Sequence, residues 1–154
     1  MNAEGLSIEL GEEMRVSALL RVPDDGLGVG IVLGHGAGTD MTSPFMVAFA
    51  EGLAARGFTT LCFNFPYKER GRRLPDPGSK LERTFRAVTD HLRSRPGIKH
   101  LLIGGKSMGG RIASLSAAHG LACDGLVFLG YPLHAAGKTV LRDCLLYTSD
   151  AADE

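Results

Sequence analysis

The 154-residue sequence lacks several features that would assign it to a particular class of protein. No apolar run approaches the roughly 18 residues that indicate a membrane span. No apolar run follows basic residues at the start of the chain, so we expect no signal peptide. With these features missing, we expect a cytoplasmic protein that does not insert into a membrane.

Cysteine is scarce, and charge of either sign is not in excess. The three cysteines (Cys62, Cys123 and Cys144) have irregular spacing, which fits neither a disulfide framework nor a zinc site. Seventeen basic residues balance seventeen acidic ones, so the formal net charge is zero. This balance gives no indication of a nucleic acid or an anionic membrane as a partner. We also expect no metal or other cofactor.

The hydrophobic pattern that is present predicts strands alternating with helices. Two alternating segments at the start are typical of an antiparallel pair, and a helix with Ser43 as N-cap opens at Pro44 and ends at Gly57. The other predicted elements are joined by short turns, apart from a polar loop over residues 68–78. Predicted strands cover residues 6–10, 14–22, 29–33, 58–63, 98–103 and 125–129; two further helices cover residues 80–95 and 111–119. This alternation predicts an α/β domain with a mainly parallel sheet.

The stretch GGKSMGG fits two different motifs. Gly105-Lys106-Ser107 could end a phosphate-binding loop, and the same residues with Met108-Gly109 spell G-x-S-x-G, the nucleophile elbow of a hydrolase. A phosphate-binding loop needs a glycine five residues before Gly105, where this chain has His100. The residues between them are an apolar run suited to a buried strand. Strand, sharp turn and helix therefore favour the elbow, with Ser107 as the nucleophile.

A second glycine-rich turn follows the third predicted strand, at His35-Gly36-Ala37-Gly38. Acyl transfer needs backbone N–H donors aimed at the oxygen that becomes negatively charged in the transition state. We expect one donor to be the N–H of Met108, at the start of a helix whose dipole favours an anion. We expect the other to be the N–H of Ala37, with Gly36 as the second choice.

Further residues are candidates for the substrate pocket. Tyr67 and Tyr131 each follow a strand, at the end of the sheet where ligands bind in α/β proteins. His35 is a candidate for the pocket or, less favoured, for a catalytic base; the alternative is a structural histidine bonded to backbone.

Basic residues near these candidates have two interpretations. Lys106 could tune the site for an anionic substrate, or it could be a solvated lysine. Four basic residues in the polar loop could bind carboxylate or phosphate, or could belong to a solvated loop: Lys68, Arg70, Arg72 and Arg73.

Five segments together carry a family resemblance: GHGAG, NFPY, GRR, GGKSMGGRIAS and LVFLGYPLH. In this order they resemble the α/β-hydrolase family of testis-expressed protein 30. That family also contains the third subunit of the NSL histone-acetyltransferase complex and dienelactone-hydrolase-like bacterial proteins. The resemblance covers nearly all of residues 29–143. It implies an α/β-hydrolase fold, a mainly parallel sheet flanked by helices, with Ser107 at the nucleophile position.

The resemblance also implies a triad acid and then a histidine, in turns after two further strands. After Ser107 this chain offers Asp124, Asp143, His119 and His134, none of them in those contexts. We therefore expect a C-terminally truncated fold, which lacks the last strands and helices, and a fragment that is itself inactive.

The last eleven residues, CLLYTSDAADE, differ in style from the rest of the chain. One choice of codons for residues 144–154 gives a sequence that resembles the transposon-end adapter used in preparing sequencing libraries, read in frame. The alternative is a genuine acidic tail. We interpret residues 1–143 as the N-terminal part of one hydrolase domain and residues 144–154 as adapter sequence.

Together these observations predict a serine hydrolase that acts on a small carboxylic ester, lactone or thioester through an acyl-enzyme. The alternative is a protein-interaction domain that kept the hydrolase scaffold without its activity, because a fold does not fix a function. The sequence indicates no specific protein partner.

Overall fold

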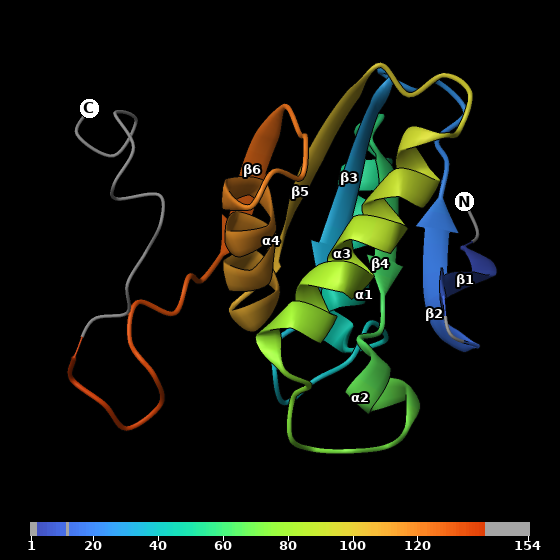
Figure 1. Cartoon of the computed structure of the whole chain (residues 1–154). Coiled ribbons are helices and arrows are strands. Elements are labelled where there is room, and N and C mark those ends of the chain that lie inside the picture. The colour runs from blue at the N-terminus through green and yellow to red at the C-terminus, as the bar shows by residue number, and fades with distance from the viewer. Residues whose placement is uncertain (1–2, 12, 141–154) are drawn as a thin grey trace.

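A six-stranded sheet with helices on both faces forms the protein (Figure 1). The computed structural model describes residues 3–11 and 13–140, so the predicted adapter segment, residues 144–154, lies outside the described residues. The strands are β1 (Glu4–Gly11), β2 (Met14–Arg21), β3 (Val29–Gly34), β4 (Thr59–Phe63), β5 (His100–Lys106) and β6 (Gly125–Leu129). The helices are α1 (Pro44–Ala54), α2 (Pro66–Glu69), α3 (Gly78–Arg93) and α4 (Met108–Ala118).

The strand order is β1-β2-β4-β3-β5-β6. The four strands β4, β3, β5 and β6 are parallel, and the β1–β2 hairpin adds to β4 in the antiparallel direction. The prediction of a mainly parallel sheet with an antiparallel pair at its start is confirmed. Because parallel strands share their direction, the turns that follow β3, β4, β5 and β6 all lie at the same edge of the sheet.

The helices cover the two faces unequally. Helix α1 packs against β4 on one face, and α3 and α4 cover the other, where they lie side by side (Figure 1). The larger core lies under α3 and α4 and contains an aromatic cluster in which the ring of Phe63 is 4.9 Å from Phe65 and 5.2 Å from Phe85. A smaller core lies under α1 and includes Met46 and Cys62.

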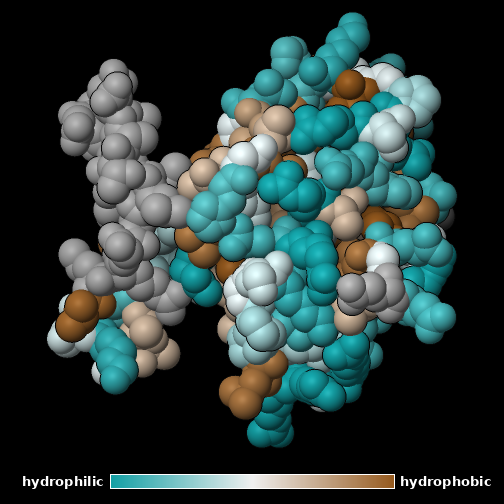
Figure 2. Space-filling view, viewed as in Figure 1, coloured by the Kyte–Doolittle hydropathy of each residue, from teal (hydrophilic) through white to brown (hydrophobic). Residues whose placement is uncertain are grey.

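Local sequence signals account for the helix boundaries. Helix α1 begins at Pro44, and the Ser43 hydroxyl accepts the Met46 N–H as the N-cap. Helix α3 buries a stripe of apolar residues while Arg83, Arg86 and Asp90 are exposed. The solvent side of this face is accordingly dominated by polar side chains (Figure 2).

The predicted polar loop over residues 68–78 is partly wrong. Its first residues belong to the short helix α2, and Gly78 already belongs to α3. Pro66 fixes the backbone in a conformation that suits the first helical position, so a turn of helix forms directly after β4. The Tyr67 N–H, which no residue within this short helix accepts, donates to the carboxylate of Asp76 at 2.8 Å.

Candidate active site

Ser107 lies between β5 and α4 in a backbone conformation that is rare for a residue with a side chain. Its φ is 51° and its ψ is −112°. In the described part of the chain, Glu13 is the only other non-glycine residue with positive φ. Such a conformation costs on the order of 1–3 kcal/mol and persists only where the surroundings enforce it. This sharp strand-to-helix turn is the geometry of a nucleophile elbow.

The two glycines of the motif allow this turn to pack against β3. A Cβ atom added to Gly105 or to Gly109 would lie 2.2 Å from the carbonyl oxygen of Gly34. Both positions are therefore restricted to glycine by the backbone of a neighbouring strand. His100 and residues 101–103 belong to β5, so the stretch before Gly105 contains no loop that could surround a phosphate.

The two predicted N–H donors, those of Met108 and Ala37, both belong to segments that adjoin Ser107. Met108 is the first residue of α4, so its N–H has no partner within the helix. Ala37 lies in the oxyanion turn, which we define as His35 to Gly38. A Cβ on Gly36 would lie 3.8 Å from the Ser107 Cβ, so this turn adjoins the serine. Among the described residues, no turn or loop hydrogen bond uses the N–H of Met108 or the N–H of Ala37.

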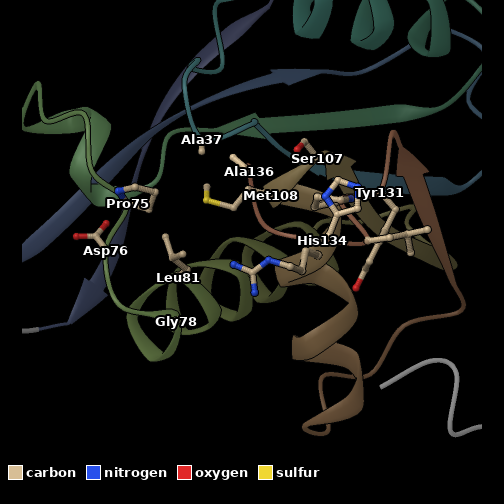
Figure 3. Close-up of a pocket in the computed structure, with 13 residues that line it drawn as sticks. Ala37, Pro75, Asp76, Gly78, Leu81, Ser107, Met108, Tyr131, His134 and Ala136 are labelled. Atoms are coloured by element: carbon tan, nitrogen blue, oxygen red, sulfur yellow. The ribbon is translucent and has the colours of Figure 1, made fainter. Parts of the chain in front are cut away.

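A cavity of about 660 Å³ opens beside Ser107. It brings together four of the predicted site residues, Ala37, Ser107, Met108 and Tyr131 (Figure 3). The rest of its lining comes from the α2–α3 loop, from α3 and α4, and from the segment after β6: Pro75, Asp76, Gly78, Leu81, Arg111, Pro132, Leu133, His134 and Ala136.

His35 and Tyr67 are not among the residues that line this cavity, contrary to the prediction that they belong to the pocket. His35 is completely buried, and Tyr67 is 1% exposed. Both side chains are instead bonded to backbone groups. The Tyr67 hydroxyl donates to the Ala37 carbonyl at 2.7 Å, and His35 Nε2 accepts the Phe65 N–H at 3.1 Å. Their hydrogen bonds hold the oxyanion turn against the segment that follows β4.

The hydrogen bonds of His35 also define its protonation. Since Nε2 accepts from Phe65, the proton of the neutral ring is on Nδ1, which donates to the Gly36 carbonyl at 2.7 Å. Burial lowers the pKa of His35 below its ordinary value and outweighs the opposing effect of the Gly36 bond. With both ring nitrogens engaged, His35 has the structural role and is not available as a base.

Three charged or titratable residues of the cavity were not predicted to line the pocket, although His134 was considered from the sequence as a triad member. Asp76 has a buried carboxylate that accepts the Tyr67 N–H and pairs with Lys80 at 3.5 Å. Arg111 follows Ser107 by one turn of α4, a spacing that was visible in the sequence. His134 follows β6 and comes from the chain segment next to Tyr131 (Figure 3).

The other basic candidates lie elsewhere. The Lys106 ammonium lies 4.6 Å from the centre of the Phe45 ring, in a cation–π contact rather than in the cavity. Lys68 lies against the ring of Tyr67. The loop residues Arg70, Arg72 and Arg73 are exposed and do not line the cavity.

The described residues supply no bonded base for Ser107. Within residues 3–11 and 13–140, no hydrogen bond joins the Ser107 hydroxyl to a histidine. His134 lies at the cavity, but its ring is exposed and its Nδ1 is 3.4 Å from the Ala135 oxygen. His119 caps the far end of α4 and pairs with Glu82 at 2.6 Å.

The same residues, 3–11 and 13–140, contain no cluster of three or more histidine, cysteine or acidic side chains that could hold a metal ion. None of the helices in that part of the chain has both the length and the apolar character needed to cross a membrane.

Comparison with known proteins agrees with this geometry. The model of the α/β-hydrolase domain family matches residues 28–147, which is most of the chain and includes the oxyanion turn and the elbow. The chain belongs to the α/β-hydrolase family. The fold is accordingly the α/β-hydrolase fold that the motifs predicted, a mixed, mostly parallel sheet flanked by helices.

Solved structures of bacterial proteins share this fold. An α/β serine hydrolase without a lid from Xanthomonas campestris has a TM-score of 0.75 at 20% identity, over 92% of this chain and 67% of its own. An α/β serine hydrolase homologue from Coxiella burnetii has a TM-score of 0.74 at 20% identity, over 89% of this chain and 67% of its own. A dienelactone hydrolase from Anabaena variabilis has a TM-score of 0.69 at 25% identity, over 82% and 62%. This α/β-hydrolase chain thus spans about two thirds of their length or less.

Proposed function

We propose that this chain carries the nucleophile and the oxyanion hole of a serine hydrolase that cleaves a small carboxylic ester, lactone or thioester. The observation that carries the proposal is the strained elbow at Ser107, enclosed by Gly105 and Gly109 and facing the cavity. A serine held in this strained conformation, beside two N–H groups to which the described residues offer no backbone acceptor, is the arrangement that acyl transfer needs. The dienelactone hydrolase similarity supports the same class of reaction.

The proposed reaction begins when a general base takes the Ser107 proton and the hydroxyl oxygen attacks the carbonyl carbon of the substrate. The carbonyl oxygen becomes an anion, which accepts hydrogen bonds from the N–H groups of Met108 and Ala37. Loss of one such donor typically costs about 3–4 kcal/mol in barrier height. The intermediate then expels the alcohol or thiol, and water hydrolyses the acyl-Ser107 ester by the reverse sequence of proton transfers.

We place the general base and its acid partner after residue 143, in the chain order Ser, acid, His that the family resemblance implies. In the proposal, residues 1–143 are the N-terminal part of the domain. The finer resemblance, to the family of testis-expressed protein 30, rests on the five quoted segments. A cytoplasmic location remains our prediction.

Labelling with a fluorophosphonate tests the proposal, because this reagent reacts with an activated serine much faster than with an ordinary one. We expect the protein encoded by the complete gene to be labelled at Ser107, and Ser107→Ala to abolish the labelling. Ser94→Ala is the control, since Ser94 is the exposed C-cap residue of α3 and its hydroxyl donates to the His91 carbonyl. Residues 1–154 alone should react much more slowly.

Two outcomes would contradict the proposal. Absence of labelling in the folded, complete protein would favour the non-catalytic interaction domain instead. Equal labelling of the complete protein and of residues 1–154 would show that the base lies within this chain, and His134→Ala would then identify whether His134 is that base.

A further inference from the structure

The oxyanion turn is held by the segment that follows β4, although the two are about thirty residues apart in sequence. Two hydrogen bonds join them, and a third joins the same segment to Met41, three residues beyond the turn. His35 Nε2 accepts the Phe65 N–H at 3.1 Å, and Asn64 Oδ1 accepts the Met41 N–H at 2.9 Å. The other bond to the turn runs from the Tyr67 hydroxyl to the Ala37 carbonyl at 2.7 Å. The bonds to His35 and Met41 lie on either side of Ala37 in the sequence. The Tyr67 bond is made to Ala37 itself, which supplies the proposed N–H donor.

Within the oxyanion turn, the Gly36 carbonyl accepts the Nδ1–H of His35 at 2.7 Å, the Thr39 N–H at 3.2 Å and the Thr39 hydroxyl at 3.3 Å. These bonds hold Ala37 from its N-terminal side, and the Tyr67 bond holds it from its C-terminal side. Ala37 is flanked by Gly36 and Gly38, and glycine restricts the backbone less than any other residue. Ala37 and Gly38 are exposed, and a Cβ on Gly38 would meet no atom within 4 Å. The direction of the Ala37 N–H therefore depends on the few bonds made within and to the turn. A hydrogen bond to the Ala37 carbonyl fixes the orientation of that residue at its C-terminal side.

Tyr67 is itself held rigidly enough to act as a fixed support. Its side chain is 1% exposed, and its N–H donates to Asp76, whose carboxylate is paired with Lys80. Burial, with the nearby negative charge of Asp76 as a smaller cause, raises the pKa of Tyr67 to about 12. The hydroxyl is consequently a hydrogen-bond donor throughout the physiological pH range.

We propose that Tyr67 is a positioning residue: its hydroxyl holds Ala37 so that the Ala37 N–H points at the developing oxyanion beside Ser107. This inference rests on the proposed function. Tyr67 does not line the cavity, so it acts on the reaction through Ala37 and not through contact with the substrate. Its effect should appear in the rate of the chemical step and leave substrate binding nearly unchanged.

Tyr67→Phe tests the proposal in the complete protein, because it keeps the buried ring and removes the one hydroxyl. With a p-nitrophenyl ester as substrate, we expect kcat to fall roughly 10- to 100-fold, since a misdirected donor loses part of what complete removal of a donor would lose. We expect KM to stay within about twofold of its original value. In ¹⁵N relaxation measurements, the amides of residues 36–38 should become more mobile.

Thr84→Val is the matched control. The Thr84 hydroxyl is also buried and also donates to a backbone carbonyl, that of Lys80, at 2.8 Å, but this bond lies within α3 and does not reach the oxyanion turn. It should destabilise the protein by a similar amount and leave both kcat and the mobility of residues 36–38 unchanged.

The failure of this inference and that of the proposed function can be told apart. If the wild-type protein hydrolyses the ester and Tyr67→Phe matches it in kcat and in backbone mobility, the positioning role is wrong and the function stands. If the wild-type protein neither reacts at Ser107 nor hydrolyses the ester, the proposed function fails and the role of Tyr67 in it fails as well.

Discussion

Helix α4 approaches β3 closely at Gly109, and this contact predicts that Gly109→Ala and Gly52→Ala have opposite effects on stability. A Cβ on Gly109, in the first turn of α4, would lie 2.2 Å from the oxygen, 2.4 Å from the carbonyl carbon and 2.9 Å from the Cα of Gly34. A Cβ on Gly52, in α1, would meet only the flexible end of Arg56, at 3.7 Å. Both glycines are helical, so replacement by alanine gains about 1 kcal/mol of helix propensity at either position.

The net effect on the free energy of unfolding differs between the two positions, because the backbone of Gly34 is fixed by its neighbouring strands. It lies in the middle of the sheet, paired with β4 and β5, and the atoms that the new methyl group meets are backbone atoms. Overpacking typically costs about 1–3 kcal/mol, and we take the upper end here because no side chain can rotate away. Gly109→Ala should then destabilise the fold by about 2 kcal/mol. Gly52→Ala should stabilise it by about 1 kcal/mol, a difference of about 3 kcal/mol between the variants.

Urea unfolding followed by circular dichroism measures this difference. With an m-value of roughly 2 kcal/mol/M, the two midpoints should be separated by about 1.5 M. Gly109→Ala should in addition lose fluorophosphonate reactivity, because separating α4 from β3 moves Ser107. If the two variants unfold within about 0.3 M of each other, α4 and β3 do not approach as closely as the structure shows and the reasoning is refuted.

Two more predictions follow from buried titratable groups. The lowered pKa of His35 means that the unfolded state binds its proton more readily, so His35 reduces stability as pH falls below about 6.5. The free energy of unfolding of the wild type should therefore fall from pH 7 to pH 5 more steeply than that of His35→Gln, by up to about 1.4 kcal/mol per pH unit; parallel curves would contradict this. Burial raises the pKa of the Cys62 thiol to about 12, so iodoacetamide at pH 8 should not modify Cys62 until the protein is unfolded. Peptide mass spectrometry measures this, and modification of Cys62 in the native state at the rate of a free thiol would show that it is not buried.

The sequence by itself determined most of the elements and the elbow at Ser107, because the signals for these are local. Ser43 and Pro44 define the start of α1 through the chemistry of the first helical turn. The apolar spacing in α3 depends only on which side of the helix faces the sheet. The spacing of two glycines around Ser107 specifies a strand, a sharp turn and a helix within a few residues, and the structure has all three.

Only the tertiary structure decided which side chains face the cavity. Tyr67 and Tyr131 both follow strands at the same edge of the sheet, and the sequence gives no reason to separate them. Tyr131 lines the cavity, whereas Tyr67 turns inward to bond the carbonyl of Ala37, thirty residues away. Asp76 reaches the cavity wall because its carboxylate accepts the N–H of Tyr67. Such choices depend on which backbone groups remain unbonded once the strands have paired, and this is fixed by segments that are distant in sequence.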